Sequence, residues 1–260
     1  GDVTGGGNAP GFAGGPGPGP GPGPGPGPGI PFGGSGGSGP GPNGAVRCDN
    51  MLTGVIRDFD PSIHPDFEPA GVPFATLPNR TKQAVEELGI VAPQIGDDFK
   101  PQYAKDAAAG SITTYGKMFF DAWFRDTANV NLSTNYTIAF EDVDGDGVFT
   151  FNNGGMQFFP IDNGGFGNWQ PWQNGVHNFH FTYELHAKFI YRPGMTFMFS
   201  GDDDVWVFIN GRLAVDIGGI HARIERGVQL DTLGLTPNSE YQLDFFWAER
   251  HVAQSNFRID

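Results

Sequence analysis

The stretch FSGDDDVWVFINGRLAVDIGGIH, residues 199–221, predicts two β-strands joined by a tight turn. Apolar residues recur at every second position over 205–209 and again over 213–217, as in strands that pack on one face. Between them lies Asn210-Gly211, the type of dipeptide that favours a two-residue type I′ hairpin because both positions take positive φ. The sequence therefore predicts a β-hairpin with the acidic run Asp202-Asp203-Asp204 directly before its first strand.

Similar patterns lie on both sides of this hairpin. Every odd position from 179 to 191 is apolar or Ala, whereas most even positions are polar, which predicts a strand with one buried face. Shorter strands are expected at 195–199, 241–247 and 257–259. Short strands separated by Gly, Asn, Asp and Pro turns are typical of an all-β sandwich or barrel. One helix is expected, at residues 81–88.

Composition narrows the class of function. The 260 residues carry a formal net charge of −14, with only 15 Lys and Arg, which argues against a nucleic-acid partner. An acidic balance fits an extracellular protein or one that binds divalent cations. No apolar run approaches the roughly 20 residues of a membrane helix, so no membrane insertion is expected. Residues 1–15 lack a signal peptide, and we expect a mature secreted form.

The first 44 residues differ from the rest of the chain. Gly and Pro alternate strictly from residue 15 to residue 29, which excludes a helix or a central strand and favours polyproline II. This segment is either a tether or the part through which copies of the protein assemble. The folded β domain is expected over residues 45–260. Its single cysteine, Cys48, either forms an intermolecular disulfide, remains a free thiol or is a small buried apolar side chain.

Two acidic clusters could bind calcium. Asp202, Asp203 and Asp204 repel one another, and a shared calcium ion would remove that repulsion; the alternative is a solvated loop tip. The second cluster, Asp142, Asp144 and Asp146 with Gly147, matches the first half of an EF-hand loop, but Asn153 replaces its closing glutamate. Its flanks, 136–140 and 148–151, resemble strands, so an acidic hairpin turn is the alternative there.

Catalytic patterns are absent from the sequence. We find no G-x-S-x-G, no usable Cys-His pairing and no phosphate-binding Gly loop. The sequence therefore predicts a protein that is not an enzyme.

Residues 199–221 closely resemble the signature of fibro-slime domains, a branch of the PA14 superfamily. Further matching pieces occur in the family's order at residues 54–59, 64–68, 158–162, 165–167, 177–181, 246–251 and 255–259. The resemblance covers about residues 50–260. It implies a PA14-like β-sandwich or barrel on a cell surface or in an extracellular matrix.

The resemblance also implies a calcium site. In lectin-like PA14 domains, two consecutive aspartates joined by a cis peptide hold a calcium ion that binds sugar hydroxyls, and Asp202 and Asp203 occupy that place. A second loop completes the site in these relatives, and residues 249–256 are the candidate here, with Asn256 as a ligand and Glu249 and His251 beside the bound sugar. Asp204 stands where many PA14 domains have Gly, and we place it at the ligand as well.

Two functions are compatible with these features. The first is a secreted, calcium-binding structural protein of an extracellular fibre or cell-surface matrix, which assembles with other copies partly through its Gly/Pro-rich segment. The alternative is a calcium-dependent, carbohydrate-binding adhesin whose partner is a polysaccharide. The Gly/Pro-rich segment and the lone Cys48 favour the structural protein.

Overall fold

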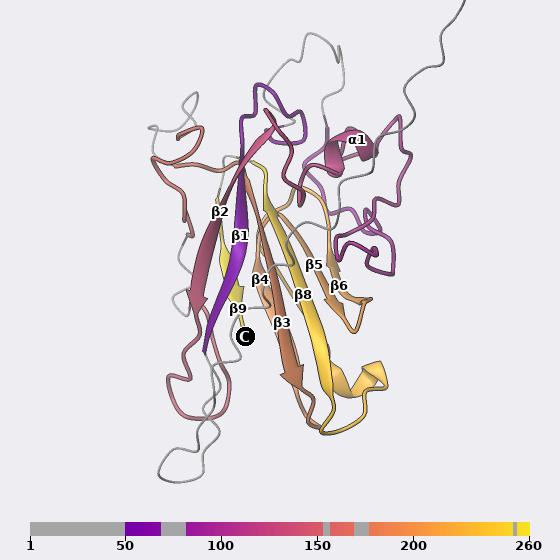
Figure 1. The fold of residues 1–260 in the computed structure, drawn as a ribbon, viewed down its shortest axis with the longest axis vertical. Helices are drawn as coiled ribbons and strands as arrows, with labels where there is room; N and C mark the ends of the chain where they lie inside the picture. The colour runs from indigo at the N-terminus through magenta and orange to yellow at the C-terminus, as the bar shows by residue number, and fades with distance from the viewer. Residues whose placement is uncertain (1–49, 69–81, 153–156, 169–176, 252–253) are drawn as a thin grey trace, which may run out of the picture. The chain divides into compact units, whose positions relative to one another are not determined.

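A computed structural model describes residues 50–68, 82–152, 157–168, 177–251 and 254–260 (Figure 1). The described chain is nearly all β, as predicted. Its strands are β1 (Met51–Phe59), β2 (Asn131–Ala139), β3 (Phe181–Ile190), β4 (Thr196–Gly201), β5 (Asp204–Ile209), β6 (Arg212–Ile217), β7 (Ile224–Gln229), β8 (Glu240–Glu249) and β9 (Phe257–Ile259). The polyproline II segment, the domain boundary after residue 44 and Cys48 lie outside the described residues.

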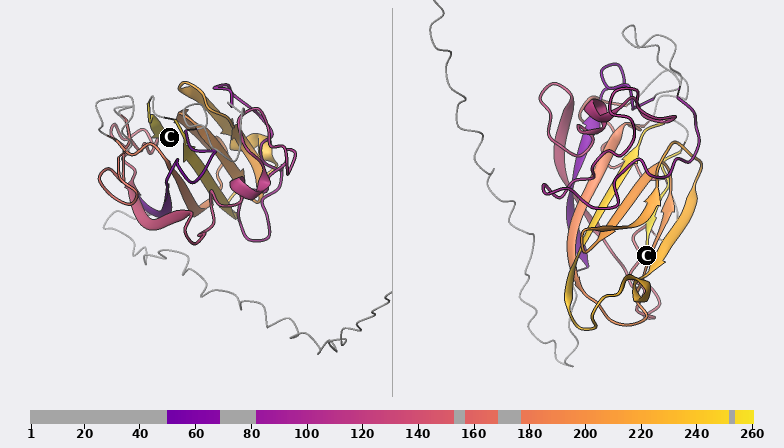
Figure 2. Two further views of the ribbon diagram at one scale, coloured as in Figure 1. Left: turned by 90° about the horizontal axis from the view of Figure 1, so that it is seen from above. Right: turned by 90° about the vertical axis from the view of Figure 1, so that its right-hand side faces the viewer.

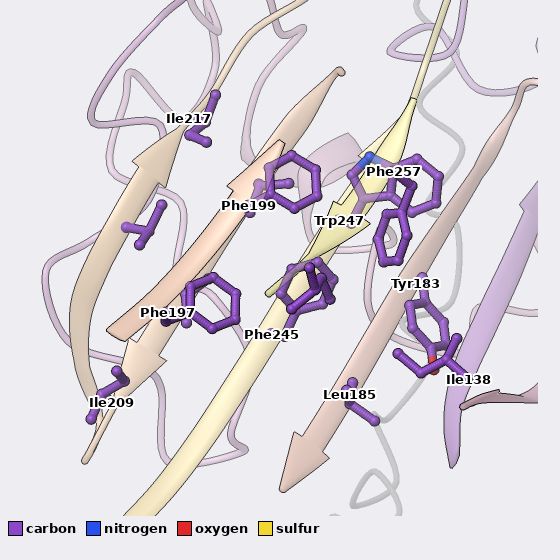
Figure 3. Packing of buried hydrophobic residues seen from close by; sticks show 14 of the residues in the cluster. Ile138, Tyr183, Leu185, Phe197, Phe199, Ile209, Ile217, Phe245, Trp247 and Phe257 are labelled. Carbon is purple, nitrogen blue, oxygen red and sulfur yellow. The ribbon is translucent and has the colours of Figure 1, made fainter. Parts of the chain in front are cut away.

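The strands form a sandwich of two antiparallel sheets (Figures 1 and 2). The larger sheet has the order β2-β1-β3-β8-β5-β6, and the smaller has the order β7-β4-β9. The main core lies between the sheets, where Trp247 of β8 and Phe257 of β9 pack with ring centroids 4.5 Å apart (Figure 3). Because apolar side chains from both sheets meet here, burial of this shared face holds the two layers together.

The predicted hairpin is confirmed as β5 and β6. Asn210 has φ 52° and Gly211 has φ 74°, the positive values that a type I′ turn requires. The strands pair from Val205 opposite Ile217 to Ile209 opposite Arg212, with one register shift after Val207. The turn dipeptide therefore fixes the register of the two core strands that follow the acidic run.

The other face of the larger sheet is buried as well, and there the prediction for residues 179–191 was partly wrong. Residues 181–185 of β3 are buried on both faces. The second layer comes from residues 59–67 and 90–124, which pack aromatic rings on the sheet. The ring centroids of Phe120 and Trp206 are 5.7 Å apart, and those of Phe124 and Phe246 are 5.0 Å apart. Period-two alternation does not reveal such a layer, because its polar positions are satisfied by partners far away in the sequence.

The helix predicted at residues 81–88 is wrong over its described part, 82–88. Glu86 forms a β-bridge with Gly219, and the backbone N–H of Glu87 donates to Gly218 O. These tertiary bonds use the backbone groups that a short helix would need. The strand expected at 148–151 is also reduced to bridges of Thr150 and Phe151. The described helical segments are α1 (Lys117–Phe120) and the 3-10 turn η1 (Leu230–Leu233), and neither could cross a membrane.

Candidate cation site at the β4–β5 junction

The acidic run lies where the chain passes from one sheet to the other. Asp202 and Asp203 follow β4 of the smaller sheet, and Asp204 begins β5 of the larger. Their exposures are 3%, 3% and 0%, so the run is not a solvated loop tip. The peptide bond between Asp202 and Asp203 is cis. Three adjacent carboxylates are therefore enclosed at one end of the sandwich, and each must be stabilised by partners inside the protein.

Asp204 is neutralised by a fully buried arginine. Arg250 Nε donates to Asp204 Oδ2 at 2.5 Å and its Nη2 donates to Oδ1 at 3.1 Å, while the backbone N–H of Gly219 donates to Oδ1 at 2.6 Å. The guanidinium also donates to Thr113 O and lies over the Trp123 ring. Burial raises the pKa of Asp204, and the Arg250 charge opposes that shift. Both oxygens of Asp204 are thus occupied by a bidentate ion pair.

Asp202 and Asp203 accept hydrogen bonds from neutral donors. Asp202 Oδ1 accepts from the backbone N–H of Asn256 at 2.5 Å, and its Oδ2 accepts from Asn256 Nδ2 at 2.7 Å. Asp203 accepts from the backbone N–H groups of His221 and Arg250, both at 3.1 Å. Neither carboxylate forms an ion pair with a residue that the structure describes. Burial raises the pKa of Asp202, and it raises the pKa of Asp203 well above its usual range.

Glu249, the last residue of β8, is the least satisfied side chain of the site. It is 0% exposed, and neither of its oxygens accepts a well-formed hydrogen bond from a described residue, although the Ser255 hydroxyl and the His251 backbone N–H lie near enough to oppose the rise of its pKa. The nearby Ser255 hydroxyl donates to Phe158 O instead. Burial, followed by the charges of Asp203 and Asp202, raises the pKa of Glu249 well above its usual range. A buried carboxylate without a partner is costly, which points to a positive charge as the missing partner.

These residues are of the kinds that bind a hard divalent cation, but among the described residues only Asp142, Asp144 and Asp146 bring three carboxylate oxygens within 4.8 Å of one another. Asp202 and Asp203 are adjacent in the chain, so with Glu249 they supply carboxylates from two segments, and the Asn256 amide, on a third, donates to Asp202 Oδ2 at 2.7 Å. Calcium takes six to eight oxygen ligands, and carboxylates and amide carbonyls are among its usual ones. Shared coordination would also remove the repulsion that raises the pKa values of Asp203 and Glu249.

Two neighbours of the site had no local sequence signal for their roles. Arg250 neutralises Asp204, although its partner lies 46 residues away. His221 Nδ1 donates to Ala222 O, which leaves Nε2 with a free lone pair, and this buried atom has no hydrogen-bond partner among the described residues. Both residues belong to the stretches that resemble fibro-slime domains, and that resemblance is the signal that could have found them. An imidazole nitrogen beside carboxylates makes zinc the competitor to calcium.

His251 is placed by contacts with Glu68. Its Nε2 lies 3.3 Å from Glu68 Oε1, and His180 Nε2 lies 3.4 Å from Glu68 Oε2. The backbone N–H of Glu68 donates to Arg250 O, which ties residues 64–68 to the end of β8. His251 therefore belongs to a histidine–carboxylate cluster, and its role at a bound sugar stays a prediction.

The Asp142 loop is also brought together by the structure. One carboxylate oxygen from each of Asp142, Asp144 and Asp146 lies within 4.8 Å of the others. Asp142 also accepts hydrogen bonds from the backbone N–H groups of Gly145 and Gly147 at 2.9 and 3.2 Å. These bonds are those of the acidic turn that was the alternative to a metal site. Calcium binding by this loop stays a prediction.

Comparison with known proteins gives relatives without descriptive names. No family model matches the chain. Among curated proteins, protein psiQ of Dictyostelium discoideum is 35% identical over 223 residues, which cover 81% of this chain and 21% of psiQ. Protein psiR of that organism is 35% identical, with the same coverage of both chains, and protein psiD is 40% identical over 66% of this chain and 35% of psiD. The chain thus spans between about a fifth and about a third of the length of these relatives.

Among solved structures, an anti-sigma factor domain-containing protein aligns with a TM-score of 0.28 and 19% identity. The alignment covers 40% of this chain and 33% of that one.

Proposed function

We propose that residues 50–260 form a calcium-binding module of a secreted structural protein, one that belongs to an extracellular fibre or a cell-surface matrix. The observation that carries the proposal is the Glu249 carboxylate, which is fully buried, receives no well-formed hydrogen bond from a described residue, and has its pKa raised by burial and by the charges of Asp203 and Asp202. The resemblance to fibro-slime domains and the net charge of −14 support it further.

In this proposal Asp202, Asp203, Glu249 and Asn256 hold the ion. A bound calcium supplies positive charge to carboxylates that otherwise repel one another. The protein's own contribution is to fix the ligands in advance: Asn256 orients Asp202 through two hydrogen bonds, and backbone N–H groups orient Asp203. Arg250 takes Asp204 out of the ligand set. Extracellular modules bind calcium with Kd values of roughly 10⁻⁴–10⁻³ M, an affinity that such a site could reach.

Burial favours a structural role over a lectin role. Asp202 and Asp203 are each 3% exposed, and Glu249 is 0% exposed. A calcium that also binds sugar hydroxyls needs coordination positions open to solvent, whereas an enclosed ion serves to join chain segments. The adhesin therefore stays the alternative, and assembly through residues 1–44 stays part of the proposal. The partial coverage of longer relatives is compatible with a module that works within a larger protein.

Thermal unfolding of Glu249→Gln tests the proposal. In chelator, we expect the variant to be more stable than the wild type, because it removes a buried, unpaired carboxylate. In calcium, we expect the wild type to gain stability, about 2.7 kcal/mol at 100 times Kd, and the variant to gain much less. Glu225→Gln, which removes an exposed carboxylate from β7, is the matched control and should respond to calcium as the wild type does.

The comparison between the two conditions makes the test specific. A wild-type melting temperature that stays constant between chelator and 100-fold variation in calcium would refute the site. The same calcium response in Glu249→Gln as in the wild type would remove Glu249 from it. A larger response to zinc than to calcium would assign the site to a different metal through His221.

A further inference from the structure

Strand β2 (Asn131–Ala139) is the terminal strand of the larger sheet, and it lacks the usual protection of an edge. Its sequence, NLSTNYTIA, contains no charged residue and no proline. Natural proteins place such residues on edge strands because exposed backbone groups otherwise pair with strands of other molecules. A nine-residue edge strand without them calls for another means of protection.

The same strand carries two acceptor motifs for N-linked glycans, Asn-x-Ser/Thr. They are Asn131-Leu132-Ser133 and Asn135-Tyr136-Thr137. The structure separates them sharply. Asn131 is 8% exposed; its Nδ2 donates to Ala122 O and Arg125 O, both at 2.9 Å, and its Oδ1 accepts from the backbone N–H of Thr127 at 3.0 Å. A sugar on Asn131 Nδ2 would break the bonds that hold residues 122–127 against the start of β2.

Asn135 has the opposite surroundings. It is exposed, and its side chain makes no hydrogen bond to any described residue. Ile138 is buried in the core between the sheets and Tyr136 packs against that core, so Asn135 and Thr137, at the alternate positions, face the other side of the sheet. Asn135 and Thr137 thus share the outer face, where Thr137 Oγ1 lies 2.7 Å from Thr53 Oγ1. A group attached to Asn135 Nδ2 would project away from the core.

We propose that Asn135 carries an N-linked glycan and that Asn131 does not. The inference rests on the secreted location in the proposed function, and it is independent of the calcium site. In the transfer, Asn135 Nδ2 attacks C1 of an N-acetylhexosamine held on a polyisoprenyl diphosphate. The C1–N bond forms, the C1–O bond to diphosphate breaks, the amide nitrogen loses one proton, and the lipid diphosphate leaves. The hydrated glycan then covers the uncharged edge strand.

Expression of the full chain behind a cleavable secretion signal in eukaryotic cells tests the proposal. The secreted protein is treated with a glycan-removing amidase in ¹⁸O water, which converts each glycosylated Asn to labelled Asp, and fragmentation of the peptide across residues 131–139 locates the label. We expect label at Asn135 and none at Asn131. This peptide is separate from Asn79-Arg80-Thr81, a third acceptor motif that lies outside the described residues.

Paired variants distinguish the two motifs. Asn135→Gln and Thr137→Ala should each abolish the label, whereas Thr137→Ser, which keeps the hydroxyl, should retain it. Ser133→Ala destroys the first motif without touching the Asn131 hydrogen bonds, and it should leave the glycan unchanged. Unlabelled Asn135 in the secreted wild type, or label at Asn131, would overturn the proposal. The calcium response, measured on the same preparations, should be equal with and without the glycan, so failure of either proposal is visible separately.

Discussion

The three consecutive aspartates have three different sets of partners. Asp202 binds Asn256, Asp203 binds the backbone at His221 and Arg250, and Asp204 binds the Arg250 side chain. The sequence alone predicted an acidic run before a core strand, and the resemblance singled out its first two members. Neither could assign a hydrogen-bond partner to each aspartate, because those partners lie between 15 and 54 residues away along the chain. The unsatisfied state of Glu249 is likewise a property of the folded packing.

His64 should make the protein sensitive to acid. It is buried, its Nε2 donates to Phe119 O at 3.0 Å, and its Nδ1 accepts from the backbone N–H of Asp66 at 3.3 Å, which fixes the neutral ring. Burial lowers the pKa of His64 to about 4. The ring in the unfolded state, with a pKa near 6.5, therefore binds the proton more tightly than the ring in the folded state. The contribution of the neutral ring to the free energy of unfolding is thus complete above pH 6.5. It is lost as the pH falls toward 4.

The loss attributable to this ring should reach about 3 kcal/mol. Chemical unfolding of the wild type and of His64→Gln, whose amide can still donate to Phe119 O, measures it between pH 7 and pH 4. Subtraction removes the contribution of the carboxyl groups that both proteins share. We expect the wild type's advantage to shrink across this interval. Parallel stability curves for the two proteins would show that His64 does not titrate differently in the folded state.

At the scale of elements, the sequence predicted strands well where packing is simple. β5 and β6 follow the apolar alternation of the sequence, and Asn210-Gly211 predicted the turn that joins them. The sequence-based prediction failed at residues 82–88, where hydrogen bonds to residues 218–219 replace a helix. Strand β7, whose exposed positions include Glu225 and Gly227, was not predicted. Local patterns thus predict elements whose partners are sequence neighbours or whose faces are uniform, and they fail where distant segments decide.

Gly54 of β1 is expected to be essential for the pairing of β1 with β3. A Cβ at this position would lie 2.2 Å from Glu184 O and 2.6 Å from Tyr183 Cε2, and both belong to β3. Gly54→Ala should therefore push the strands apart and destabilise the protein by about 2–3 kcal/mol. Gly211→Ala is the control: its Cβ would meet nothing closer than 3.7 Å, so only its positive φ is unfavourable, by about 1 kcal/mol.

Urea unfolding of the two variants beside the wild type measures both values. The larger loss is expected for Gly54→Ala, and a loss no greater than that of Gly211→Ala would mean that β1 and β3 can separate locally without cost.

For residues 50–260 as a whole, the candidate site joins the two sheets at one end. Asp202 and Asp203 follow β4 of the smaller sheet, Glu249 ends β8 of the larger, and Asn256 directly precedes β9 of the smaller. β9 has three residues, so its own ladder with β4 and the Asn256–Asp202 bonds must hold it in place. A cation at the site would therefore stabilise the C-terminal strand far more than the edge formed by β1 and β2.

Hydrogen exchange resolves this regional effect. On chelation, we expect faster amide exchange at residues 254–260 and at 198–204, because loss of the ion restores repulsion among Asp202, Asp203 and Glu249 and loosens the segments that carry them. Exchange in β1 and β2 should change little, since their ladder contains none of these residues. Glu249→Gln in calcium should show an intermediate pattern, having neither the full repulsion nor the full set of ligands. Uniform acceleration over both sheets would instead mean that the ion stabilises only global folding, and exchange unaffected by chelator at 254–260 would contradict a cation that links β9 to the larger sheet.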